Sequence, residues 1–120
     1  MKKKTLVFGA STKPDRYSNF AVKRLLTSGY EVVAFGNRAG KITSIEIDTE
    51  LMPYKDVHTI TLYLNPSNQK PYYDYLISLN PKRIIFNPGT ENPEFFNLLE
   101  QSGIDYEIAC TLVLLSTNQY

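Results

Sequence analysis

One loop near the start of the chain has the position of a phosphate-binding loop. The stretch FGASTKPDRYSNF, from Phe8 to Phe20, follows a short apolar run and precedes a helical pattern. A helix that begins here presents free N–H groups and a positive dipole end to an anion. The dinucleotide fingerprint G-x-G-x-x-G has three glycines, whereas this loop holds only Gly9. Gly9 allows close backbone approach to a ligand, but Gly9 and Ser11 are equally suited to closing a tight turn.

Three more loops have the same small, polar character, and each follows an apolar run that predicts a strand. They are Gly36-Asn37-Arg38, Asn65-Pro66-Ser67 and Asn87-Pro88-Gly89-Thr90. In a parallel sheet the carboxyl ends of the strands lie on one rim, and ligands bind where the strand order reverses. We therefore expect the four loops to form one site, which favours a ligand over a purely structural role for Gly9.

The basic residues in these loops narrow the class of ligand. Lys13 and Arg16 lie in the first loop, and Arg38 follows the second predicted strand. An NAD site usually places an acid at the end of that strand, but Glu31 stands at its beginning, on the other rim. An arginine favours a ribose that carries an extra phosphate, as NADP and coenzyme A do. Each arginine taken alone is also compatible with a solvent-exposed position.

Residues for acid–base or nucleophilic catalysis are scarce. The one histidine, His58, precedes a predicted strand and so falls on the rim away from the loops. Asp15 and Glu91 are the acids nearest the expected site, and no Ser/His/Asp or Cys/His set forms without His58. The one cysteine, Cys110, fits either a small buried side chain or a thiol that forms a mixed disulfide with a ligand. These counts argue against a His/Cys metal site and favour binding over catalysis.

Short apolar runs alternate with amphipathic segments, and this pattern predicts the elements that position the loops. Strands are predicted at Thr5–Phe8, at Glu31–Phe35, around Ile42, Ile45 and Ile47, and at Thr59–Leu64, Arg83–Phe86 and Tyr106–Ile108. Helices are predicted at Asn19–Ser28, at Gln69–Leu79 and, capped by Asn92, at Pro93–Ser102. An apolar segment, Thr111–Leu115, is expected to cover a sheet edge or a partner subunit. The alternation predicts an α/β, Rossmann-like, doubly wound, mainly parallel sheet of five or six strands in the order 3-2-1-4-5.

Length and composition set the broad class of the protein. The 120 residues predict a single domain, residues 1–120, and 42% hydrophobic residues are enough for a core. A formal net charge of +1 gives no electrostatic footprint for nucleic acid. No apolar run approaches a membrane span, and the run after the basic start is too short for a signal peptide. One cysteine excludes an internal disulfide and is typical of a cytoplasmic protein.

Several motifs, taken in order, resemble one protein family. The first is Val7-Phe8-Gly9-Ala10-Ser11 with Pro14, Arg16 and Ser18, and the second is Gly29-Tyr30-Glu31-Val32-Val33 leading to Asn37-Arg38. The third is Asn87-Pro88-Gly89-Thr90-Glu91-Asn92, followed later by Cys110. In order and spacing, over almost the whole chain, this set resembles the small single-domain CoA-binding proteins related to the N-terminal CoA-binding domain of the succinyl-CoA synthetase α subunit.

The resemblance implies a role for each loop toward bound coenzyme A. The residues implied are Gly9, Ala10 and Ser11 at the pyrophosphate, Arg16, Arg38 and, as a further candidate, Lys41 at phosphates, Leu64, Asn65 and Pro66 beside the adenine, and Gly89 and Thr90 near the pantetheine. The matching motifs add Pro14, Asn37, Asn87, Pro88 and Cys110 to the candidate site. Gly36-Asn37 departs from the Asn-Pro common in the family, and Asn87-Pro88-Gly89 departs from a more usual apolar run. Within these 120 residues we therefore expect no counterpart of the phosphohistidine domain of the synthetases.

The leading hypothesis is a module that binds coenzyme A or an acyl-CoA at the carboxyl-terminal rim of the sheet, without catalysis. One alternative is an NADP-dependent oxidoreductase, against which the lack of a proton donor in the expected pocket counts. A second alternative is an interaction subunit whose nucleotide pocket is vestigial. The acyl group and the oligomeric state stay open, and both a homodimer and a partner protein are compatible with the sequence.

Overall fold

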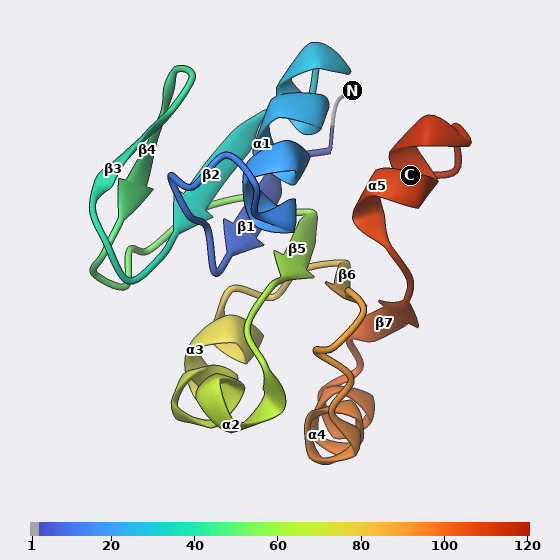
Figure 1. The fold of residues 1–120 in the computed structure, drawn as a ribbon. Coiled ribbons are helices and arrows are strands. Elements are labelled where there is room, and N and C mark those ends of the chain that lie inside the picture. The colour runs from blue at the N-terminus through green and yellow to red at the C-terminus, as the bar shows by residue number, and fades with distance from the viewer. Residues whose placement is uncertain (1–2) are drawn as a thin grey trace.

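A seven-stranded sheet forms the centre of the molecule. In the computed structural model, which describes residues 3–120, the strand order is β3-β4-β2-β1-β5-β6-β7 (Figure 1). The strands are β1 (Thr5–Phe8), β2 (Val32–Phe35), β3 (Gly40–Ile42), β4 (Ile45–Asp48), β5 (Thr59–Leu62), β6 (Arg83–Phe86) and β7 (Asp105–Ile108). Adjacent strands are parallel except β3 and β4, which form a hairpin. The strand order reverses between β1 and β5, so the loop after β1 lies at the switch point.

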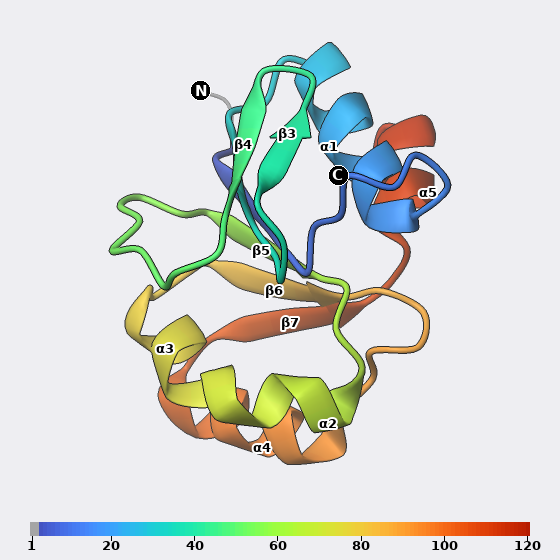
Figure 2. The same cartoon turned by 60° about the vertical axis from the view of Figure 1, so that its left-hand side comes forward.

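Helices cover both faces of this sheet. They are α1 (Tyr17–Thr27), α2 (Pro66–Gln69), the short 3-10 helix η1 (Lys70–Tyr72), α3 (Tyr73–Ser78), α4 (Pro93–Ser102) and α5 (Thr111–Ser116). α1 and α5 lie side by side on one face, whereas α2, α3 and α4 lie on the other (Figures 1 and 2). This three-layer arrangement is that of a doubly wound fold.

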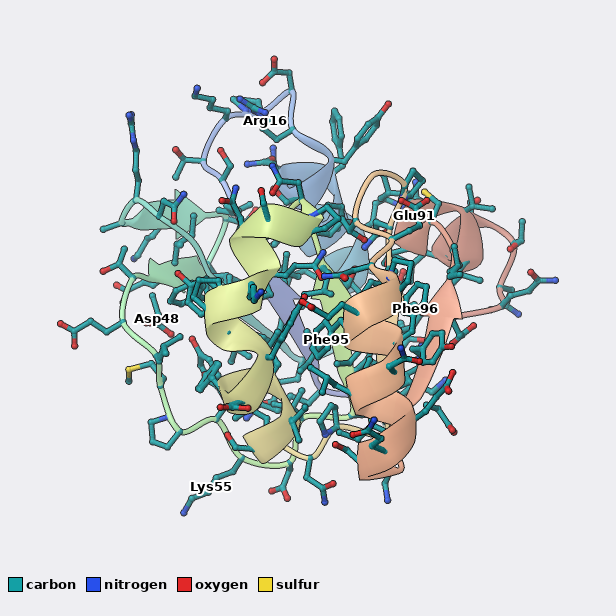
Figure 3. All side chains as sticks on the ribbon, turned by 90° about the horizontal axis from the view of Figure 1, so that it is seen from below. Arg16, Asp48, Lys55, Glu91, Phe95 and Phe96 are labelled. Carbon is teal, nitrogen blue, oxygen red and sulfur yellow. The ribbon has the colours of Figure 1, made fainter. Side chains whose placement is uncertain are left out.

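Each face of the sheet has its own apolar core, because successive side chains of a strand point to opposite faces. Phe8 of β1 packs toward α3 and α4, and Val7 packs toward α1 and α5. Both side chains are fully buried. Figure 3 shows Phe95 between α3 and α4, where its ring stacks on Tyr73 with centroids 4.5 Å apart. The two cores hold the strand ends, and with them the loops, in fixed positions.

The predicted α/β, Rossmann-like, mainly parallel sheet is confirmed, but its strand number and order need correction. Five or six strands in the order 3-2-1-4-5 were expected, and the structure has a hairpin where one third strand was predicted. Thr43 has a positive φ of 57°, which turns the chain back so that Ile42 pairs with Ile45. Ile42 and Ile47 are thereby both buried, and the hairpin forms one edge of the sheet.

Two helical segments also differ from what the sequence indicated. The segment predicted as one helix, Gln69–Leu79, is divided into α2, η1 and α3, because Pro71 has no N–H to donate within the helix. The apolar segment Thr111–Leu115, for which we expected a cover on a sheet edge or a partner, forms α5 and packs beside α1.

Candidate functional site

A cavity of about 560 Å³ opens at the carboxyl-terminal ends of β1, β2, β5 and β6. Four loops line it, as the sequence predicted for one rim. The predicted site residues in its lining are Gly9, Ala10, Ser11, Arg16, Asn37, Arg38, Leu64, Asn65, Pro88, Gly89 and Thr90. Figure 3 shows Arg16 and Glu91 toward this end of the molecule and Lys55 at the opposite end.

Two glycines let the ends of three strands approach one another at the floor of the cavity. Gly9 has a φ of 103°, and a Cβ placed on it would lie 3.0 Å from the carbonyl carbon of Tyr63. A Cβ on Gly36 would lie 2.2 Å from the carbonyl oxygen of Ala10, too close for any side chain. The N–H groups of Gly9 and Ala10 both donate to the carbonyl oxygen of Phe35 at 2.8 Å. The first loop therefore needs glycine for its turn and for its packing against the second loop.

The N-terminus of α1 borders the cavity and has no capping side chain. Its N-cap residue, Arg16, makes no side-chain hydrogen bond to the helix, and the first turn contains no acid. By contrast, Asn65 caps α2 and Asn92 caps α4 through their side-chain oxygens. Tyr17 and Ser18, the first two residues of α1, line the cavity. Uncapped N–H groups and the positive end of the helix dipole are suited to an anion at this position.

The side chains around the cavity carry positive charge without matching negative charge. Lys13, Arg16 and Arg38 line it, and its lining contains no Asp or Glu. Among residues 3–120, the two ion pairs are Lys4 with Glu31 and Arg83 with Glu107, and neither involves the cavity lining. The three cations are therefore available to bind an anionic ligand.

Some predicted site residues lie outside the cavity lining. Pro14 is exposed in the first loop, Lys41 is exposed on β3, and Pro66 begins α2. Cys110 is a half-buried free thiol at the N-cap of α5.

Asn87 is also outside the lining, and it supports the structure beneath the cavity. Its side-chain amide donates to the hydroxyl of Thr61 at 2.6 Å and to the carbonyl of Leu62 at 2.8 Å. Its side-chain oxygen accepts from the backbone N–H of Thr111 at 2.9 Å. Asn87 thereby ties β5 and the start of α5 to the end of β6.

Sequence reasoning did not single out several residues that line the cavity: Thr12, Tyr17, Phe35 and Tyr63. Tyr63 was assigned to the predicted strand Thr59–Leu64, whereas β5 ends at Leu62 and Tyr63 begins the loop. Burial raises the pKa of Tyr63 to about 12. Its hydroxyl is buried and lacks a hydrogen-bond partner within the described residues.

Groups that could exchange a proton near neutral pH are missing from the described lining of the cavity, which contains no Asp, Glu, His or Cys. His58 lies at the amino-terminal end of the sheet, where its Nδ1 is 2.8 Å from the hydroxyl of Thr59. Burial, together with the positive charges of Arg83, Lys3 and Lys82, lowers the pKa of His58. Residues 3–120 also contain no cluster of His, Cys, Asp and Glu suited to a metal ion.

The fold and the cavity define a Rossmann-like α/β protein with a positively charged cavity at its switch point. The model of the CoA-binding domain family matches residues 3–116, and the chain belongs to this family. No curated protein sequence matches the chain significantly. Within residues 3–120, no helix has the length and apolarity that crossing a membrane requires.

Solved structures place the fold among small proteins of similar length. The chain is 43% identical to a protein whose crystal structure describes it as uncharacterised, with a TM-score of 0.97 over 100% of this chain and 99% of that one. A protein from Thermus thermophilus is 21% identical, with a TM-score of 0.85 over 99% of this chain and 91% of that one. An oxidoreductase from Bacillus cereus is 13% identical, with a TM-score of 0.61 over 88% of this chain but 34% of that one, so this likeness concerns the fold alone.

Proposed function

We propose that this chain is a cytoplasmic, single-domain module that binds coenzyme A, free or acylated, and carries out no chemistry on it. The observation that carries the proposal is the cavity at the switch point, where the uncapped N-terminus of α1 meets Lys13, Arg16 and Arg38 without a carboxylate in the lining. Coenzyme A has a pyrophosphate and a ribose 3′-phosphate, which match several cations and one helix end. Membership in the CoA-binding domain family supports this ligand.

Each part of the ligand has candidate partners in the loops. The first loop, Gly9–Ser11, lies against the pyrophosphate, where Gly9 lets the ligand come close to the backbone, and Pro14 shapes the same loop before α1. Arg16 and Arg38 bind phosphates, and Lys41 reaches them from the hairpin. Leu64, Asn65 and Pro66 border the adenine, beside Asn37. The loop Asn87–Thr90 runs along the pantetheine arm, and Cys110 lies behind this loop.

The absence of tuned acid–base groups in the described lining supports binding rather than catalysis. General acid–base catalysis needs a group whose pKa lies near the working pH and that reaches the reacting atoms. Tyr63 has a raised pKa of about 12, and so keeps its proton at neutral pH. The chain therefore holds its ligand for another protein or reaction.

A ligand panel tests the proposal against its alternatives. Purified protein is mixed with CoA, acetyl-CoA, NADP⁺ and NAD⁺, and its thermal unfolding and binding heats are measured. We expect stabilisation by the CoA ligands alone, by about 2.7 kcal/mol at a concentration of 100 times Kd. Stabilisation by NADP⁺ but not by CoA would instead favour an oxidoreductase. A change in nicotinamide absorbance when the protein is mixed with NADPH and a panel of small-molecule substrates would then establish one. Binding of none of the four, with a protein partner that co-purifies, would establish a vestigial pocket.

A further inference from the structure

One wall of the cavity consists of two loops that do not follow each other in the chain. Leu64 and Asn65 come from the loop after β5, and Pro88, Gly89 and Thr90 come from the loop after β6. Behind this wall lies Gln69, the last residue of α2, which is fully buried although it is polar. Gln69 itself does not line the cavity.

The side-chain amide of Gln69 joins the two loops. Its Nε2 donates to the carbonyl oxygen of Leu64 at 2.8 Å and to the carbonyl oxygen of Thr90 at 2.8 Å. Its Oε1 accepts from Nδ2 of Asn92 at 3.0 Å. Both amide hydrogens are therefore used, one on each loop. An amide buried this deeply is costly unless it is hydrogen-bonded, so these contacts fix where Gln69 and its partners lie.

The loop after β6 is ordered by hydrogen bonds within itself and to α4, and Gln69 connects it to the loop after β5. Thr90 donates to the carbonyl oxygen of Asn87 through its N–H at 2.9 Å and through its hydroxyl at 2.7 Å. Asn92 caps α4 by accepting from the N–H of Phe95 at 3.3 Å. Gln69 thus joins a loop that is held at its other end to the loop after β5.

We propose that Gln69 is a positioning residue that sets the spacing between the β5 and β6 loops, and so selects ligands with an arm beyond the nucleotide. The inference rests on the proposed function, in which the β6 loop follows the pantetheine arm. Without the amide, the carbonyl group of Thr90 loses its link to α2 and turns toward water, which moves the β6 loop. The β5 loop keeps its place beside the adenine, because Tyr63 donates to the carbonyl oxygen of Phe8 and Asn65 caps α2. The first loop and the N-terminus of α1, proposed to hold the phosphates, make no hydrogen bond to Gln69 in the described structure.

Two ligands separate this role from a general loss of structure. The variant Gln69→Met keeps the length of the side chain and removes both donors. Titration calorimetry compares CoA with adenosine 3′,5′-bisphosphate, which carries the nucleotide and its ribose phosphate but no pantetheine arm. We expect the affinity for CoA to fall roughly tenfold, as loss of hydrogen bonds that order a binding loop implies, and the affinity for the bisphosphate to stay within about twofold.

The control is Gln101→Met, which changes an exposed glutamine of α4 and should leave both affinities unchanged. An equal loss for the two ligands, or no loss for either, overturns the role of Gln69 and leaves the proposed function standing. Failure of the unaltered protein to bind CoA overturns the proposed function instead.

A measurement on the unaltered protein covers the case in which Gln69→Met does not fold. The side-chain amide hydrogens of the glutamines are followed by NMR in ¹⁵N-labelled protein transferred to heavy water. We expect those of Gln69 to exchange much more slowly than those of exposed Gln101 and Gln119, because both donate within a buried site. Exchange at the rate of Gln101 would show that the link between the loops is absent.

Discussion

Arg38 tests the match between the cavity and a phosphorylated ribose. It lines the cavity at the end of β2, where an NAD site usually places an acid, and it has no ion pair within the described residues. For Arg38→Ala we expect the affinity for CoA to fall roughly 10- to 100-fold, the scale of a charge-assisted hydrogen bond. The affinity for dephospho-CoA, which lacks the 3′-phosphate, should stay within about twofold. Titration calorimetry with both ligands measures the difference.

Arg24→Ala is the matched control for this prediction. Arg24 is an exposed arginine in the last turn of α1, at the end of the helix away from the cavity. Its loss changes the net charge by the same amount and should leave both affinities unchanged. Equal weakening of CoA and dephospho-CoA in Arg38→Ala would remove the proposed contact with the 3′-phosphate.

The candidate site residues that could be found from the sequence are those whose residue type by itself suits a tight turn or an anionic ligand. Gly9 indicated a tight turn, and Arg38 indicated a phosphate, because both properties belong to a single residue and its place after a strand. Gln69 was assigned only to a helix, because its role depends on a carbonyl oxygen 21 positions away in the chain. Tyr63 was missed because the predicted strand ran on to Leu64, and sequence patterns locate the end of a strand only to within one or two residues.

At the scale of elements, the first turn of α1 combines an exposed helix start with a proposed anion site. Tyr17, the first residue of the helix, is 72% exposed and lines the cavity. An acid at this position interacts favourably with the helix dipole, but it repels a bound pyrophosphate. One substitution should therefore raise the stability of the free protein and lower the affinity for the ligand.

We test this with Tyr17→Asp against Tyr17→Asn, which has the same shape without the charge. Relative to Asn, Asp should increase the free energy of unfolding by about 0.3–1 kcal/mol in urea titrations at low salt. The same Asp should weaken CoA binding by roughly three- to tenfold, by the repulsion of like charges. If Asp and Asn bind CoA equally, the pyrophosphate does not lie at the N-terminus of α1.

The elements that sequence patterns predicted best are the buried parallel strands and the capped helices. The strand Thr5–Phe8 agrees with β1 and the helix Pro93–Ser102 with α4, because a continuous apolar run and an Asn-Pro start are local signals. The β3–β4 hairpin was read as one strand, because its turn contains no glycine and depends on the positive φ of Thr43. α5 was not predicted as a helix, because its six residues form one short apolar run.

At the scale of the whole molecule, the two rims of the sheet have different compositions. The carboxyl-terminal rim has open loops and unpaired cations around the cavity. The amino-terminal rim is closed by Tyr120, whose hydroxyl is hydrogen-bonded to that of Thr5. The guanidinium of Arg83 lies 4.6 Å from the centre of the Tyr120 ring, and the ring of Tyr30 packs against it at 4.9 Å. We infer that the amino-terminal rim contributes to stability and the other rim to binding.

Tyr120→Ala tests whether the two rims act independently. Tyr120 is 8% exposed, and removing its ring leaves a cavity beside Arg83, so we expect the free energy of unfolding to fall by roughly 3 kcal/mol in urea titrations. Val113→Ala, at a 54% exposed position of α5, should change it by less than about 0.5 kcal/mol. At a temperature where both variants are folded, their affinities for CoA should equal that of the unaltered protein, because Tyr120 lies at the rim opposite the cavity. A fall in the CoA affinity of folded Tyr120→Ala, with Val113→Ala unchanged, would mean that the sheet transmits the disturbance from one rim to the other.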